Sequence, residues 1–139
     1  MRISVLSIII CFVLLSTSCR EDERIIPSTP NQVTPGVNGT SVKGFFLLNE
    51  GNMGSNKATL DYFDYETGIY HKNIYAERNP GVVQELGDVG NDIQIYGNKL
   101  YAIINCSHFV EVMNVETAKH ITQISIPNCR YIVFKDKYA

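Results

Sequence analysis

The segment from Asn49 to Asn56 carries the polar groups best suited to binding a ligand. Amide, carboxylate and hydroxyl side chains are interspersed with glycines there, in the order Asn-Glu-Gly-Asn-Met-Gly-Ser-Asn. A loop of this kind between two strands can present hydrogen-bonding groups on a rigid rim, which makes Asn49, Glu50 and Asn52 candidate ligand-binding residues. The alternative is structural, because glycines also serve long hairpin connections that need special backbone angles.

A second polar group precedes a predicted strand and adds Asp88, Asn91 and Asp92 to the candidate ligand-binding residues. With Glu85, the two aspartates could coordinate calcium through hard oxygens, or they could form hydrogen-bond networks that fix the strand. No Asp-x-Asp-x-Asp-Gly loop is present, so no metal site is predicted. Arg130 stands before the next predicted strand, where it could bind a phosphate or carboxylate in a bidentate manner or pair with a neighbouring acid.

The sequence predicts neither an enzyme nor a bound cofactor. Ser107 and His108 are adjacent, and neighbouring side chains on a strand point to opposite faces, which argues against a catalytic pair. No nucleophile elbow or phosphate-binding glycine loop is present. We therefore assign no catalytic residue and expect a non-covalent ligand.

Two cysteines remain in the region expected to fold. Cys106 and Cys129 could form a disulfide that closes a loop of about 24 residues and contributes on the order of 3 kcal/mol. Alternatively they stay free and pack as small hydrophobic side chains. The sequence leaves both alternatives open.

An internal repeat places these residues in a fold. Residues 60–74 align without gaps to residues 110–124, with aliphatic residues matched at both ends, acids matched at 61 and 111, and Glu-Thr shared. A second similarity relates residues 93–100 to 131–138. Short strands that recur every 40 to 50 residues are typical of β-propeller blades.

The predicted strands form an all-β propeller of about two to two and a half four-stranded antiparallel blades. The ranges are 44–49, 58–64 and 69–75 in a blade spanning 44–75, then 91–96, 99–105, 109–114 and 119–125 in a blade spanning 90–125, then a truncated blade at 130–139. No helix is predicted. Because a propeller needs at least about four blades, we expect this to be the N-terminal portion of a longer protein.

The turns between these strands agree with that reading. Gly97-Asn98 is typical of a two-residue hairpin turn, and Gly68 suits the left-handed position of a longer turn. The repeat places Ala118 at the same position, where a left-handed residue other than glycine costs about 1 kcal/mol, or the turn adjusts.

The first nineteen residues predict an exported lipoprotein. Arg2, the apolar run from Ile3 to Leu15 and the small residues before Cys19 are typical of a secretory signal peptide. The apolar run of about 13 residues is shorter than the roughly 20 that span a bilayer. The stretch resembles a bacterial lipobox, so residues 1–18 are expected to be removed and Cys19 lipidated. An uncleaved anchor or a signal cut elsewhere is the alternative.

The residues after Cys19 favour the outer membrane and the cell surface over the periplasm. Glu21, Asp22 and Glu23 resemble the acidic export tag of Bacteroidetes surface lipoproteins. Residues 25–41 contain three prolines, two glycines and no charge, so 19–43 reads as lipidated cysteine, tag and flexible tether. Without residues 1–18, eleven basic and fourteen acidic residues remain, which argues against a nucleic-acid partner.

Three stretches carry a resemblance to a known family. Residues 46–56, 60–64 and 85–93, with their Asn-Glu-Gly-Asn and Gly-Asp-Val-Gly-Asn-Asp segments, resemble YncE-like β-propeller surface lipoproteins of Bacteroides and relatives. The resemblance extends over residues 44–139. It implies a seven-bladed ring whose first blade lacks its innermost strand until the C-terminus of the protein supplies it.

The resemblance also implies a function. A related group of surface propellers captures cobalamin and passes it to an outer-membrane transporter, and the likeness lies in architecture and anchoring. We therefore expect a lipid-anchored binding protein that captures a nutrient or glycan, with a corrinoid as the most concrete ligand. The alternatives are a propeller enzyme of the lactonase or quinoprotein-like type and a structural surface or adhesion module.

Overall fold

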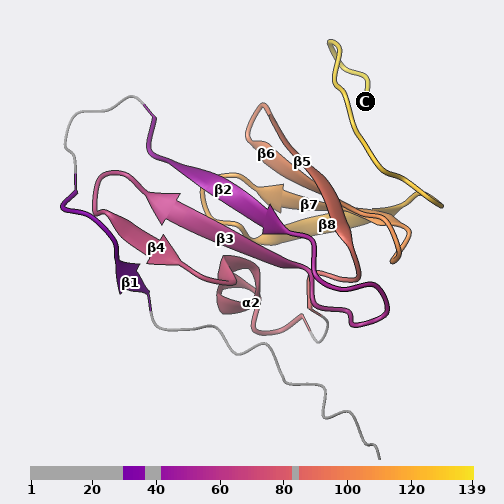
Figure 1. Ribbon diagram of the computed structural model, residues 1–139. Coiled ribbons are helices and arrows are strands. Elements are labelled where there is room, and N and C mark those ends of the chain that lie inside the picture. Colours follow the sequence, from indigo (N-terminus) through magenta and orange to yellow (C-terminus); the bar gives the residue numbers. More distant parts are fainter. Residues whose placement is uncertain (1–29, 37–41, 83–84) are drawn as a thin grey trace, which may run out of the picture.

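The fold consists of two four-stranded antiparallel sheets, as the computed structural model shows for residues 30–36, 42–82 and 85–139 (Figure 1). This confirms the predicted all-β class of partial propeller blades, and the ring is not closed. No helix in these described residues is long and apolar enough to cross a membrane. The predicted signal peptide, Cys19 and the acidic tag lie outside the described residues.

The first sheet has the strand order β1-β4-β3-β2. Its strands are β1 (Asn31–Gln32), β2 (Gly44–Asn49), β3 (Thr59–Asp64) and β4 (Ile69–His71). The predicted third strand, 69–75, is therefore shorter than expected. Among the described residues β2 pairs only with β3, so the fourth strand is added beyond β4 rather than beside β2.

The strand β1 corrects the expectation that residues 25–41 form a flexible tether throughout. Asn31 and Gln32 pair with β4, and the amide nitrogens of Val33 and Thr34 donate to the carbonyl oxygen of Gly68 at 2.9 and 3.3 Å. The outer edge of β4 offers unpaired backbone groups, and a passing segment can satisfy them without a hydrophobic core of its own.

The second sheet has the order β5-β6-β7-β8 and matches the predicted complete blade. Its strands are β5 (Gly90–Tyr96), β6 (Lys99–Ile104), β7 (Phe109–Asn114) and β8 (His120–Ser125). Each bound agrees with the prediction to within one residue. Short connections between sequential strands of alternating pattern explain why this unit was readable from the sequence.

A helix that the sequence did not predict follows the first sheet. The helix α2 (Ile74–Arg78) has only five residues, too few to show a helical period. Asn73 caps it, with φ of 49° and a side-chain oxygen that accepts from the amide of Ala76 at 3.4 Å. The helix turns Ile74 and Tyr75 into the space between the two sheets, where both are buried.

The two sheets share one hydrophobic core. Leu60 of β3 and Tyr75 of α2 join Leu100 and Met113 of the second sheet, and all four side chains are almost completely buried. A smaller cluster on the opposite face of the second sheet joins Ile103, Val110 and Val112 to residues 129 and 132. The sheets therefore pack face against face, as neighbouring blades do.

The truncated third unit forms less structure than expected. Residues 130–139 contain no strand, only an antiparallel bridge between Lys135 and Tyr138. The segment is held to the second sheet through aromatic contact, since Phe134 stacks on Tyr96 with ring centroids 4.6 Å apart.

The left-handed turn residue expected in the repeat is observed in both copies, with φ of 70° at Gly68 and 54° at Ala118.

Candidate functional site

The two polar segments predicted from the sequence meet at one end of the sheets. The Asp88 carboxylate accepts a hydrogen bond from the amide of Gly54 at 2.7 Å and a longer one from Asn56 at 3.4 Å. The backbone reinforces this contact, because the amide of Gly90 donates to the carbonyl oxygen of Glu50 at 3.0 Å. We call residues 49–56 and 85–91 the polar rim.

The predicted ligand-binding residues of the rim differ in their exposure and in their hydrogen bonds. Asn49 is half-buried, and its amide nitrogen donates to Thr59 at 2.9 Å and to Asp61 at 2.8 Å. Glu50 and Asn52 are exposed, and their side chains make no hydrogen bond or ion pair within the described part of the chain. Asp88 orders the loop, while Glu50 and Asn52 remain available to a ligand.

Three further predicted residues lie in three different surroundings. The Asp92 carboxylate accepts from the amide of Ile93 at 2.8 Å and, through its other oxygen, from the amide of Ile132 at 3.1 Å. Asp92 therefore ties β5 to the segment after β8, which is the structural alternative for this residue. The Oδ1 atom of Asn91 is buried without a hydrogen-bond partner in the described residues. Arg130 is exposed and unpaired there.

The disulfide does not form, and both cysteines are free thiols that are half-buried. The Cys129 sulfur donates to the carbonyl oxygen of Phe109 at 3.5 Å, and the Cys106 sulfur donates to Asn105 at 3.7 Å. Each sulfur thus has its own polar neighbour. Burial raises the pKa of the Cys129 thiol, which keeps it protonated.

A buried carboxylate in the first sheet was not predicted from the sequence. Asp61 is buried, and its Oδ2 accepts from the Tyr70 hydroxyl at 2.7 Å while its Oδ1 accepts from the amide of Asn73 at 2.8 Å. Burial and the adjoining carboxylate raise the pKa of Tyr70 to about 12. Asp61 thereby links β3 to β4 and to the start of the helix.

A second buried carboxylate occupies the same place in the second sheet. Glu111 is fully buried, and its Oε1 lies 2.6 Å from Nδ1 of His120 on β8. Its Oε2 has no hydrogen-bond partner in the described residues. Burial raises the pKa of the Glu111 carboxyl, although the neighbouring His120 opposes the shift. Burial and the Glu111 charge also raise the pKa of Tyr75.

The repeat contained the signal that could have found both pairs. The offset of fifty residues places Asp61 on Glu111, and it also places Tyr70 on His120. The buried acid and its hydrogen-bond partner recur together in each copy of the repeat, because a buried carboxylate needs a hydrogen bond from the next strand. These pairs stabilise the blades and do not form part of the rim.

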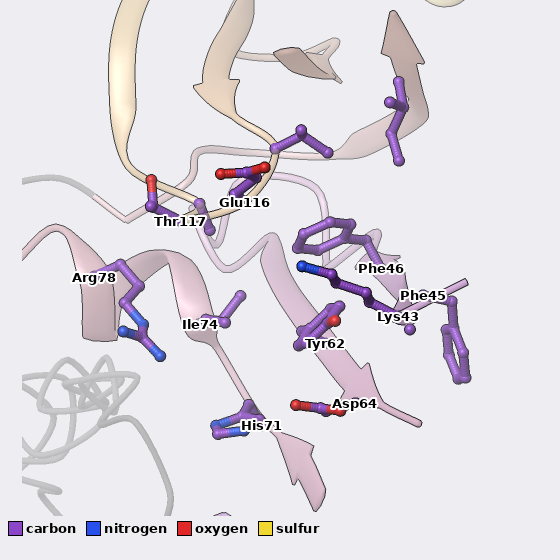
Figure 2. Close-up of a pocket in the computed structure, with 14 residues that line it drawn as sticks. Lys43, Phe45, Phe46, Tyr62, Asp64, His71, Ile74, Arg78, Glu116 and Thr117 are labelled. Atoms are coloured by element: carbon purple, nitrogen blue, oxygen red, sulfur yellow. The ribbon is translucent and has the colours of Figure 1, made fainter. Parts of the chain in front are cut away.

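A cavity of about 560 Å³ lies at the opposite end of the sheets from the rim (Figure 2). Lys43 and Phe46 of the β2 segment, Tyr62 of β3 and Arg78 of α2 line it, together with Glu116 of the turn between β7 and β8. Figure 2 shows these side chains arranged around one space, with contributions from both sheets. The sequence did not predict this cavity, because its residues are distant in the chain.

No group of three or more His, Cys, Asp or Glu residues suited to holding a metal ion is found in the described ranges. Glu85 is half-buried, with its carboxylate 3.5 Å from the side-chain amide nitrogen of Asn73. The calcium alternative has no geometric support in these residues.

Comparison with known proteins gives a family without an assigned activity. No curated protein matches the chain. A family model described as a domain of unknown function, DUF5074, matches residues 43–133, which include strands β2 to β8, the rim and the cavity. The chain therefore belongs to the DUF5074 domain family.

Proposed function

We propose that this protein is a lipid-anchored outer-membrane protein, displayed on the cell surface, whose propeller binds a nutrient or glycan ligand for uptake. A corrinoid is the most concrete ligand, and an outer-membrane transporter is the partner that would receive it. Cys19 would carry the lipid and the acidic residues 21–23 would direct export. Acyl chains contribute about 0.8 kcal/mol for each buried CH₂, so a multiply acylated cysteine can hold the domain without a spanning helix.

The observation that carries the proposal is the Asp88 bridge across the rim. One carboxylate fixes the loop through the amides of Gly54 and Asn56, at 2.7 and 3.4 Å, and leaves the side chains of Glu50 and Asn52 exposed. A loop ordered before the ligand arrives loses less conformational entropy on binding. Polar groups on a pre-ordered loop support recognition.

The two alternatives have less support. An enzyme of the lactonase or quinoprotein-like type would place a metal or cofactor on the channel axis, whereas the carboxylates of Asp88 and Asp92 accept hydrogen bonds from backbone amides. A structural or adhesion module remains a coherent alternative for a surface protein, and it predicts no saturable binding of a small molecule.

The anchoring is tested on whole cells that produce the protein. We expect labelled palmitate to be incorporated into the natural protein and not into the Cys19→Ala variant, and added protease to degrade the natural protein on intact cells. Protection from protease on intact cells with degradation after lysis would place the protein in the periplasm. Absence of label would contradict the lipid anchor.

The binding is tested by titrating the protein with cyanocobalamin and, separately, with a panel of oligosaccharides in a calorimeter. We expect saturable binding that the Asp88→Asn variant weakens by about tenfold, the cost of losing one charge-assisted hydrogen bond that orders the loop. Asp136→Asn is the matched control because it changes an aspartate in the C-terminal turn. Equal binding by both variants would contradict the rim as the site.

A further inference from the structure

We propose that the cavity between the two sheets is a second binding site, and that it takes an uncharged sugar ring. The site lies at the start of β2 and the end of β3, whereas the rim lies at the other ends of the same strands. The inference deepens the proposed function by naming a ligand class, and it rests on the protein being a binding protein. Its residues are separate from those of the rim.

Aromatic rings give the cavity a surface on which a ring can stack. The rings of Phe46 and Tyr62 have centroids 4.8 Å apart, and those of Tyr62 and His71 are 6.4 Å apart. All three residues line the cavity, so they form a row along one wall (Figure 2). The C–H face of a sugar ring is apolar, and burying it against such rings is favourable.

The permanent charges of the lining are balanced. Lys43 and Arg78 supply two cations, and Asp64 and Glu116 supply two carboxylates. A charged ligand would gain from one pair and be repelled by the other, whereas hydroxyl groups can donate to carboxylates and accept from cations. The lining therefore favours a neutral ligand with many hydroxyl groups.

Several of these polar groups lack partners inside the protein. The Nζ atom of Lys43 and the carboxylate of Glu116 make no hydrogen bond or ion pair within the described ranges. The Nε of Arg78 lies 3.3 Å from Glu77, and the Oδ1 of Asp64 accepts from the amides of Glu66 and Thr67 at 2.8 and 3.2 Å. The Nδ1 atom of His71 is buried without a hydrogen-bond partner in the described residues and is 3.9 Å from Glu77. A hydroxylated ligand would satisfy groups that the protein itself leaves unpaired.

The dimensions fit the same class. Small-molecule sites typically measure about 300 to 1,000 Å³, and this cavity measures about 560 Å³. Its walls come from both sheets and from α2, so the shape depends on how the two blades pack.

The test is nuclear magnetic resonance titration of the labelled protein with maltose, lactose, cellobiose and methyl α-mannoside. We expect at least one sugar to shift the amide signals of Phe46, Tyr62 and Thr117. Sorbitol offers hydroxyl groups without a ring face and is expected to leave those signals unchanged. Glucose is titrated beside glucuronate and glucosamine, which add a charge of either sign to the sugar ring and are expected to bind more weakly than glucose.

Two variants address the polar contacts. Lys43→Gln and Arg78→Gln are each expected to weaken sugar binding by about tenfold, as the loss of one hydrogen bond to a charged group does. Lys137→Gln is the matched control, because Lys137 lies in the C-terminal segment, and it should bind as the natural protein does. Both lining residues lie toward the surface, so the variants are expected to fold.

Several outcomes would overturn the site. These are the absence of shifts with every sugar, equal shifts with sorbitol, shifts confined to the rim, and unchanged affinity in both lining variants. Tighter binding of glucuronate or glucosamine than of glucose would overturn the preference for an uncharged ring. The proposed function and the cavity site are tested independently, because Asp88→Asn changes the rim and leaves the cavity residues intact. Loss of rim binding with retained sugar shifts would leave this inference standing.

Discussion

The two sheets place equivalent residues in different environments. The repeat places Phe63 of the first sheet and Met113 of the second at equivalent positions. Phe45 lies directly opposite Phe63, and Leu100 lies directly opposite Met113, so Phe45 and Leu100 are equivalent as well. Leu100 and Met113 are fully buried against the first sheet and α2. Phe45 is 43% exposed.

The same sequence position can therefore be core or surface, depending on which neighbour is present. The exposed face of the first sheet gathers aromatic side chains, since the ring of Phe63 lies 5.5 Å from Phe45 and 5.5 Å from Tyr65. Leu47 is 44% exposed there, and its equivalent Ala102 is completely buried. A neighbouring blade packed on this face would cover it, as the first sheet covers the core face of the second.

The largest expected effect compares Leu100 with Phe45. Leu100→Ala should lower the free energy of unfolding by about 2 to 5 kcal/mol, because it leaves a cavity between the sheets. Phe45→Ala should cost only about 1 kcal/mol, mainly from lost ring contacts. Urea denaturation of both variants measures the difference, and equal losses would show that the Phe45 face is covered in solution.

The next effect concerns the buried carboxylate of the first sheet. Asp61→Ala should lower the free energy of unfolding by about 1 to 3 kcal/mol, because Tyr70, Asn49 and the amide of Asn73 lose their acceptor. Tyr70→Phe removes only one of these bonds and should cost about 1 kcal/mol. Thermal unfolding ranks the two variants, and a larger loss for Tyr70→Phe would contradict the role given to Asp61.

A smaller effect distinguishes the two equivalent turns. A Cβ at Gly68 would lie 1.9 Å from the carbonyl oxygen of Thr34, so Gly68→Ala should displace β1 and cost about 1 to 2 kcal/mol. Ala118→Gly relieves a left-handed alanine but removes a buried methyl group, so stability should stay within about 1 kcal/mol. Chemical denaturation measures the stability of both variants, and hydrogen exchange of the Val33 amide reports whether β1 stays paired. Retained protection of that amide in Gly68→Ala would refute the docking of β1.

The smallest effect is a pH dependence that comes from the second sheet. The pKa of Glu111 is raised by burial in the folded protein, so folding favours its protonated form. Its contribution to stability is fully present below the unfolded pKa and is lost as the pH rises through the folded pKa. Glu111→Gln should flatten this part of the curve of stability against pH.

Asp92→Asn serves as the comparison, because that carboxylate is held by backbone amides outside the core. It should leave the slope assigned to Glu111 in place. A Glu111→Gln protein with the natural slope would assign the dependence to another group.

The sequence by itself determined the strands, their grouping into blades and the left-handed turns. Alternating side chains, turn residues and the fifty-residue repeat are local signals, and each reports on the backbone within a few residues. They also marked both rim segments as polar, but the contact between the two segments was not predicted and came from the structure. The five residues of α2 and the pairing of Asn31 and Gln32 carried too little local signal to be found.

Only the tertiary structure decided what the polar residues do. It assigned Asp88 to the loop and Asp92 to the segment after β8, and it left Cys106 and Cys129 as free thiols. It also created the cavity, whose lining comes from both sheets and a helix. The physical reason is that a polar side chain takes its role from the partners within hydrogen-bond distance, and packing brings those partners from distant parts of the chain.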